Sequence, residues 1–207
     1  MDTTYQGQFG PYTITPEDRN EVRIYRSAWA VMAGSAALGV AWLLVGLPVP
    51  ALTWIYAVFC LGLGVALWVV HIYMRVLHRV LQGFWGIGVV VSVALALWAE
   101  EPLALAVYHN PATIWGVGFV FAALTGLLIK ETFCFRWATS TLLVPLLPLL
   151  LLSHLLGMLN SNVGTVGLVV VAVLLLILAG RKAFQPLDPD IGDKSVFAYL
   201  KEQRQGV

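Results

Sequence analysis

Long apolar stretches without a single charged residue constrain this chain more than any other feature. Six of them follow one another, at about residues 27–47, 51–74, 80–99, 112–129, 139–159 and 163–180. At a rise of 1.5 Å per residue, each can cross about 30 Å of hydrocarbon as a helix. Backbone groups in lipid must pair within the protein, which favours helices over open strands. The sequence therefore predicts an all-α polytopic membrane protein, a bundle of six transmembrane helices.

The positions of Lys and Arg predict how the chain threads the bilayer. With six spans, both tails and the links at 75–79 and 130–136 share one face, and all 12 Lys and Arg residues fall there. The opposite face carries Glu100 and Glu101. Positive residues stay on the side that is not translocated, so both termini are expected in the cytoplasm, or in the stroma of a chloroplast-like setting. The predicted domains are an N-terminal tail with a short capped helix (1–26), the membrane domain (27–180) and a C-terminal tail (181–207).

Two further patterns concern the spans themselves. Amphipathic indole rings favour the headgroup level, and tryptophans are predicted near both membrane surfaces, at positions 29, 68, 85 and 137 on one side and 42, 54, 98 and 115 on the other. Small residues at a spacing of four are expected where helices approach closely, on the faces 118/122/126, 33/37/41 and 62/66. The echo of WGIGVV (85–90) in WGVGFV (115–120) leaves an inverted repeat as an alternative.

The segment HIYMRVLHR (71–79) places two histidines and two arginines within nine positions of an otherwise apolar chain. His71 and His78 would lie about 10 Å apart on one helix, too far for one small ion. One helix also cannot supply both axial ligands of a haem, and Arg75 and Arg79 disfavour a nearby cation. The preferred interpretation is a tight turn whose arginines reach lipid phosphates. A site for an anionic headgroup or a partner protein is the alternative.

The fifth apolar segment holds the most unusual residues inside the membrane. His154 lies within hydrocarbon, where an ionisable side chain suggests a functional role. Its depth excludes a cofactor shared with His71, whereas His109 is geometrically better placed as a partner. An interhelical hydrogen bond is the preferred interpretation. Pro145 and Pro148 each remove a backbone donor and predict a kink, with a cap supplied by Thr139 or Ser140.

Charged residues are otherwise absent from the depth of the spans. Lys130 and Glu131 are the nearest approach to a buried ion pair and are expected to mark the membrane edge, with Arg136 nearby. The net charge of +1 argues against a nucleic-acid partner. Cys60 and Cys134 have no metal-ligand spacing, and no nucleophile–base motif or phosphate loop is apparent. The sequence thus predicts no enzyme activity, no metal site and no cofactor.

Both tails carry structural signals. TPED (15–18) predicts a helix start with Thr15 as its cap. From there Arg19, Arg23 and Arg26 form a basic stripe, expected to meet anionic lipid or the acidic patch of a partner. Residues 185–200 are expected to begin extended and to continue as a short helix that docks.

The chain resembles an uncharacterised family of integral membrane proteins found mainly in cyanobacteria. The similar stretches are YQGQFGPYTIT (5–15), HIYMRVLHR (71–79), GFVFAALTGLLIKETFCF (118–135) and DIGDKSVFAYL (190–200). The resemblance implies a membrane location and a photosynthetic host, and it transfers no catalytic residue. It draws attention to the polar stretches at the cationic face.

Two functions of different classes follow from these observations. The first is a non-enzymatic protein that binds a membrane-protein partner, as an assembly or stabilising factor of a photosynthetic membrane, plasma or thylakoid. The second is a small transporter or channel whose path passes Pro145, Pro148 and His154. A pigment or haem protein is a third and weaker alternative. The candidate interaction residues are His71, Arg75, His78, Arg79, Lys130, Glu131 and Arg136, with His154 as a separate intramembrane candidate.

Overall fold

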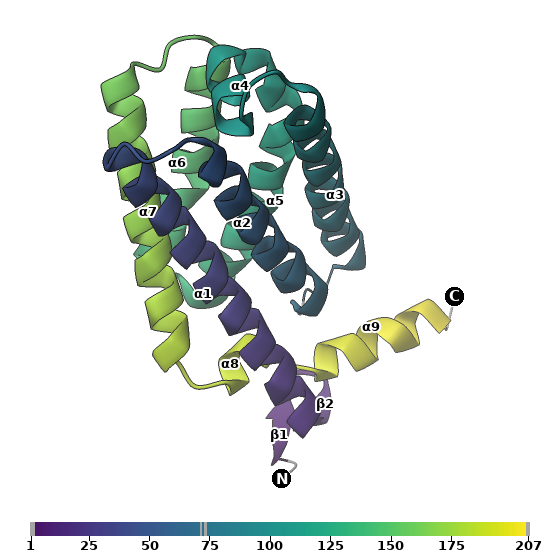
Figure 1. Ribbon diagram of the computed structural model, residues 1–207. Coiled ribbons are helices and arrows are strands. Elements are labelled where there is room, and N and C mark those ends of the chain that lie inside the picture. The colour runs from purple at the N-terminus through teal and green to yellow at the C-terminus, as the bar shows by residue number, and fades with distance from the viewer. Residues whose placement is uncertain (1–2, 71, 73, 206–207) are drawn as a thin grey trace.

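The computed structural model describes residues 3–70, 72 and 74–205, without the side chains of residues 198, 201 and 203–205. Within this part of the chain, six helical segments are long and apolar enough to cross a membrane. They are α1 (Pro16–Leu44), α2 (Pro50–Val69), α3 (Arg75–Trp98), the 3-10 turn η1 (Pro111–Thr113) continued by α5 (Ile114–Phe135), α6 (Ala138–Leu155) and α7 (Ser161–Phe184). The prediction of an all-helical, multi-pass membrane domain is confirmed (Figure 1).

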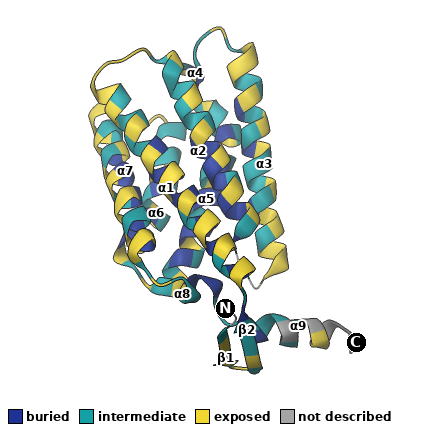
Figure 2. Cartoon of the chain, turned by 60° about the horizontal axis from the view of Figure 1, so that its bottom comes forward, coloured by how far each residue is buried: buried dark blue, intermediate teal, exposed yellow. Residues whose placement is uncertain are grey.

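The spanning helices form one bundle around a common core. Neighbours in contact follow the order α1, α2, α3, α5, α6 and α7, and α7 packs back on α1. The cartoon in Figure 2 marks residues along the spanning helices as exposed, and many exposed residues are large and apolar, as a lipid-facing surface requires. Both termini, the α2–α3 link and the α5–α6 link lie at the same end of the bundle (Figure 1). We call this the cationic end, and the end that carries the short helix α4 (Leu103–His109) the opposite end.

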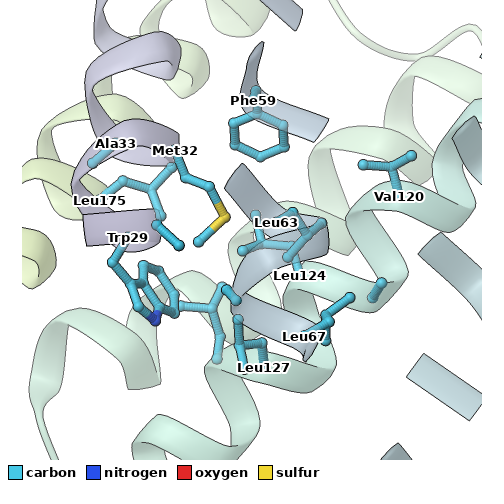
Figure 3. Close-up of a cluster of buried hydrophobic side chains, with 14 of the residues drawn as sticks. Trp29, Met32, Ala33, Phe59, Leu63, Leu67, Val120, Leu124, Leu127 and Leu175 are labelled. Atoms are coloured by element: carbon cyan, nitrogen blue, oxygen red, sulfur yellow. The ribbon is translucent and has the colours of Figure 1, made fainter. Parts of the chain in front are cut away.

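The core is built by apolar side chains from several helices. Figure 3 shows Trp29 and Met32 of α1 among leucines of α2 and α5, with Leu175 of α7 beside them. Trp29 is fully buried. Its predicted place in a surface belt of tryptophans is therefore wrong, because its indole fills the centre of the bundle. Trp54, Trp68, Trp98 and Trp115 are instead strongly exposed, as the belt prediction expects.

Glycines bring α3 and α5 into close contact. A β-carbon at Gly88 would overlap the backbone nitrogen of Val120, and one at Gly116 would overlap Val91. WGIGVV and WGVGFV, the two similar stretches, therefore pack against each other at this crossing. Close backbone approach of this kind is the usual packing device where lipid replaces water as the solvent.

The predicted small-residue faces are only partly correct. Gly62 lies against Met32 and the Ala28 carbonyl, and Gly126 lies against Leu81. Ala41 and Ala122, however, are exposed. On α5 the buried face runs through larger residues one position along the helix: Val117, Val120, Ala123, Leu124, Leu127 and Leu128. On this helix, leucine and valine side chains pack against the neighbouring helices, and the small residues form only part of the interface.

The helix α6 departs from its predicted start. Its N-cap position is Trp137, and neither Thr139 nor Ser140 caps it. The Ser140 hydroxyl donates to the Trp137 carbonyl at 2.9 Å instead. Pro145 and Pro148 lie inside one continuous helix that ends at Leu155.

The two tails fold together at the cationic end. Two strands, β1 (Thr3–Gly7) and β2 (Gly10–Ile14), form an antiparallel hairpin that the sequence pattern did not predict. The Thr15 cap is confirmed, since its side chain and that of Asp18 form a reciprocal capping box. From this cap α1 continues without a break through residues 26 and 27. The C-terminal tail forms α8 (Asp188–Ile191), which was not predicted, and α9 (Ser195–Gln205), which was.

Candidate interaction site at the cationic end

A buried ion network joins two spanning helices to the C-terminal tail. The Lys182 ammonium, near the end of α7, lies 2.7 Å from Glu131 Oε2 of α5 and 2.8 Å from Asp190 Oδ1 of α8. The side chains of Lys182 and Glu131 are fully buried, and that of Asp190 is nearly so. Charges removed from water are costly unless they are paired and hydrogen-bonded, so this contact fixes α5, α7 and α8 in one relative position.

The helix α1 enters the same network through two adjacent residues. Arg26 donates from Nε and Nη2 to Asp190 Oδ2, at 2.8 and 2.7 Å, and also binds the carbonyls of Gln185 and Pro186. The hydroxyl of Tyr25 donates to Glu131 Oε1 at 2.5 Å. The forked guanidinium can hold a carboxylate in one orientation, which a lysine cannot do. The helices α1, α5, α7 and α8 thus meet at two carboxylates.

Aromatic rings surround the central ammonium. Lys182 Nζ lies 4.7 Å from the ring centre of Phe135, 5.0 Å from that of Tyr25 and 5.7 Å from that of Trp137. Ring faces are electron-rich and attract cations, most strongly where water is excluded. The aromatic wall therefore offsets part of the hydration that Lys182 loses on burial.

The hairpin is bound to the C-terminal tail by hydrogen bonds. Asp193 Oδ2 accepts from the backbone N–H of Gln8 at 2.7 Å, and Ser195 Oγ accepts from that of Phe9 at 3.1 Å. The Tyr5 hydroxyl donates to Asp188 at 2.8 Å. We call the hairpin (residues 3–14) with residues 187–205 the terminal module.

An apolar contact and a further ion pair complete the terminal module. Ile14, Val22 and Ile191 form a small buried cluster, distinct from the bundle core. The rings of Phe9 and Tyr199 stack with centroids 4.1 Å apart. Beneath the hairpin, Lys194 binds Asp18 at 2.7 Å and Arg19 donates to Thr3 at 2.8 Å. The tails are thus folded against each other and against the first turns of α1.

Two ionisable groups of the terminal module respond to these contacts. The backbone N–H of Gln8, followed by Ser195, holds the pKa of the Asp193 carboxyl below its ordinary value. The hydrogen bond to the Asp188 carboxylate raises the pKa of Tyr5. Each shift favours the protonation state in which hairpin and tail are bound.

A comparison with protein families places the chain among membrane proteins. Residues 65–199 match the model of DUF2301, described as an uncharacterized integral membrane protein. The chain belongs to this family. No curated protein and no solved structure matches the chain.

The family match covers one part of the network and leaves out another. Its range includes Glu131, Lys182 and Asp190, together with most of the C-terminal tail. The hairpin and the two α1 residues, Tyr25 and Arg26, precede it. The DUF2301 region of this chain therefore holds the buried charges themselves, and the N-terminal part adds the groups that cover them.

The predicted cationic-end residues separate into two groups. Glu131 and its neighbour Lys130, 3.2 Å apart, belong to the network near the end of α5, and Glu131 is fully buried. Arg136 is exposed in a left-handed conformation at the end of α5. The structure thus brings together only part of the predicted set.

The other predicted residues lie on the α2–α3 link. Arg75 and Arg79 are exposed in the first turns of α3. His78 Nε2 lies 2.5 Å from the Leu67 carbonyl, which ties the start of α3 to the end of α2. His71 lies outside the described residues.

His154 faces the short helix α4 near the opposite end. Its Nε2 lies 2.9 Å from the Val107 carbonyl, and its ring stacks on Tyr108 at 6.2 Å. His109, considered as its partner, is paired with Glu101 at 2.8 Å instead. The contact of His154 is an interhelical hydrogen bond.

Sequence reasoning missed four residues of the network: Tyr25, Arg26, Lys182 and Asp190. Arg26 was expected to meet lipid or a partner's acidic patch, but it binds an acidic residue of its own chain. The available signal was weak, namely a lysine at the end of an apolar run and an aspartate directly after a proline. Their pairing depends on tertiary folding and has no local spacing.

Proposed function

We propose that the protein is a non-enzymatic membrane protein that binds a partner protein through its terminal module. The observation that carries the proposal is the anchoring of this module by Asp190 to Lys182 and Arg26. Buried charge pairs add little net stability but can specify one arrangement of segments. A surface held in one arrangement loses less conformational entropy when a partner binds. The network would thus serve to present the module in a fixed orientation.

The module would face the cytoplasm, or the stroma, in this proposal. All Lys and Arg residues lie in the tails and links of the cationic end, and such residues are retained on the untranslocated side. The resemblance to a mainly cyanobacterial family supports a photosynthetic host, with the protein acting as an assembly or stabilising factor. Fractionation of native membranes into thylakoid and plasma membrane, followed by immunodetection, tests that location.

We propose no catalytic role for the charged residues at this end. Lys182 pairs with Glu131 and Asp190, and Lys194 pairs with Asp18. In each case the ion pair joins different elements of the fold. Such contacts account for these residues by their structural effect alone.

Affinity purification from native membranes tests partner binding. The wild-type chain is expected to retain a defined membrane protein in a fixed ratio. Replacing Asp193 by Asn should reduce the retained amount, because it weakens the bond to the Gln8 N–H that closes the module. Replacing Glu100 by Asn, at the opposite end, serves as the control and should leave it unchanged. A wild-type protein that is always recovered alone would contradict the proposal.

A small transporter or channel is the second candidate. The burial of Glu131 and Lys182 favours it, because ionisable residues inside a membrane bundle often mark a transport path. Flux assays in liposomes with wild-type protein and His154→Ala test this function. Transport by the wild type that His154→Ala abolishes would support it, whereas no flux of any candidate solute would remove it.

A further inference from the structure

The two edges of the hairpin in the terminal module differ in what they can bind. In its register Gly7 lies opposite Gly10, and the two residues between them form the turn. The residues that flank such a turn form a hydrogen-bonded pair, and bonded and non-bonded pairs then alternate along the strands. Thr4 and Gln6 of β1 therefore belong to non-bonded pairs, and their backbone N–H and C=O groups point away from β2.

The outer edge of β2 is obstructed. Its outward-facing positions are Pro11, opposite Gln6, and Thr13, opposite Thr4. Proline has no N–H to donate, and natural sheets use it to protect an edge from pairing with another strand. The helix α9 also packs against β2, on the right-hand side of the hairpin in Figure 1. A further strand would thus meet an incomplete set of hydrogen-bonding groups on this edge.

The outer edge of β1 has neither protection. Its sequence, TTYQG, contains no proline and no charged residue. Thr4 and Gln6 are exposed. In the part of the chain that the structure describes, no contact outside the hairpin occupies their backbone groups. Two N–H and two C=O groups therefore lie in a row along an exposed edge.

The pattern of these groups identifies the kind of occupant. N–H and C=O groups at alternate residues are matched in spacing and direction by another extended backbone. A helix does not supply them, because its own N–H and C=O groups are paired within the helix. A phosphate headgroup offers acceptor oxygens and would leave the two carbonyls without a donor. The edge thus favours an extended polypeptide over a helix or a lipid.

We propose that the partner protein adds an extended segment to β1 and so turns the hairpin into a three-stranded sheet. This inference rests on the proposed function and names the contact through which the partner binds. The hairpin is already held in place, because Asp193 and Ser195 accept hydrogen bonds from the backbone N–H groups of Gln8 and Phe9. Little order is therefore lost when a strand is added. The residues of the segment that face the edge cannot be proline.

Amide hydrogen exchange, resolved by residue, tests the inference. In the full chain produced without its partner, the N–H groups of Thr4 and Gln6 should exchange fast, whereas those of Tyr5 and Gly7, bonded to β2, should exchange more slowly. In the complex purified from native membranes, exchange at Thr4 and Gln6 should slow by at least about tenfold, since both N–H groups become hydrogen-bonded. The N–H of Thr13, at the other edge, should keep its rate.

Two substitutions at Gln6 distinguish recognition of the backbone from recognition of the side chain. Gln6→Pro removes one outward N–H and should lower the retained partner roughly tenfold, because a main-chain hydrogen bond is lost and the ring obstructs the incoming strand. Gln6→Ala keeps the N–H and should retain the partner fully. Proline is tolerated at such an edge position, as Pro11 shows on β2. Exchange at the Gln8 N–H, which Asp193 accepts, reports whether the module stays closed.

The outcomes separate this inference from the proposed function. If a partner copurifies but exchange at Thr4 and Gln6 is unchanged, the inference is wrong and the proposed function stands. The same holds if Gln6→Pro with a closed module retains the partner, or if Gln6→Ala loses as much of it. If Gln6→Pro opens the module, the exchange rates of the wild-type complex decide alone.

A second copy of the chain is the competing occupant of the edge. Differently tagged copies expressed together test for it. If they copurify with each other and without another protein, and Thr4 and Gln6 are protected, the edge pairs with a second copy and the inference is wrong. If the wild-type chain copurifies with no other protein at all, the proposed function fails and the inference fails with it.

Discussion

Lys182 and Glu131 form an ion pair across α7 and α5 in which both side chains are fully buried, with 2.7 Å between Nζ and Oε2. Each residue lies close to the end of its helix, so the pair is at the boundary of the membrane-spanning region rather than midway through it. Asp190 binds the same ammonium from outside the bundle. The pair therefore links the packing of the membrane helices to the position of the terminal module.

Replacing Lys182 by Met should destabilise the protein strongly. The substitution leaves Glu131 and Asp190 buried without their shared cation, and breaking a buried pair in this way costs about 3–5 kcal/mol. Unfolding followed by circular dichroism in detergent measures the loss. Arg181→Met is the matched control, because Arg181 is the exposed neighbour on the same helix. Equal stability of the two variants would show that the Lys182–Glu131 pair does not contribute to the stability of the fold.

Replacing Asp190 by Asn should release the C-terminal tail while the bundle stays folded. Lys182 keeps Glu131 as a partner, whereas α8 loses the two charged contacts that Asp190 makes to Lys182 and Arg26. Backbone hydrogen exchange in residues 186–195 should become roughly tenfold faster, which corresponds to about 1.4 kcal/mol.

Asp188→Asn is the control for the release of the tail. Its carboxylate is partly exposed and lies 4.0 Å from Arg19, a surface pair worth about 0–1 kcal/mol. A smaller change in exchange is therefore expected. An increase as large as that of Asp190→Asn would contradict the anchoring role of Asp190.

The terminal module should open in acid. The pKa of Asp193 is lowered in the folded protein, so its ionised form stabilises the closed module. This stabilisation is present above the unfolded pKa of about 3.9 and is lost as pH falls through the lower folded value. Spin labels at Thr4 and Glu202, with Cys60 and Cys134 replaced by Ala, should move apart as the pH falls from about 6 to about 3.

The same pH titration of the Asp193→Asn variant shows how much of the opening depends on the Asp193 carboxylate. Asn cannot ionise, so the module should already be loosened near neutral pH and the response to acid should be weaker. Asp18 also holds part of the module through Lys194, and the pKa of its carboxyl is lowered in the folded protein as well. If wild type and Asp193→Asn open along the same pH curve, the opening does not depend on Asp193 and the role given to it is wrong.

A pair of glycines on α3 tests the packing of α3 against α5. A β-carbon at Gly88 would overlap the Val120 backbone, whereas Gly86 faces open space. Gly88→Ala should cost about 1–3 kcal/mol through overpacking. Gly86→Ala, two positions away, should be neutral or slightly stabilising because alanine favours the helix. Thermal melting in detergent compares the two variants, and equal melting temperatures would contradict the close contact between α3 and α5 at Gly88.

The membrane architecture was predictable because hydrocarbon imposes a length and a composition on every span. The capping box at Thr15 was equally accessible, since its residues are adjacent in sequence. The hairpin was not predictable, because its close contact with the C-terminal tail holds it in place. A β-carbon at Gly7, for example, would overlap Asp193 and Ser195. No local pattern encodes a contact between residues so distant in sequence.

The candidate site was predictable only where charge stood out locally. Lys130 and Glu131 interrupt an apolar run and were therefore noticed, but the partners of Glu131 on α1 and α7 were not predicted. Lys182 resembles an ordinary cationic flank, and Asp190 resembles a loop residue. Their burial results from helix packing that brings α5, α7 and α8 to one point. Composition within each segment does not contain that information.

The side of the membrane on which the cationic end lies is the most direct test of the proposed function, because partner binding is assigned to that side. Single cysteines at Val76 and at Glu100, in a background with Cys60 and Cys134 replaced by Ala, report on the two ends. In intact cells, a membrane-impermeant maleimide should label the cysteine at position 100 and spare the one at position 76, which should react only after the membrane is opened. Labelling of position 76 from outside would contradict the proposed orientation and the function that depends on it.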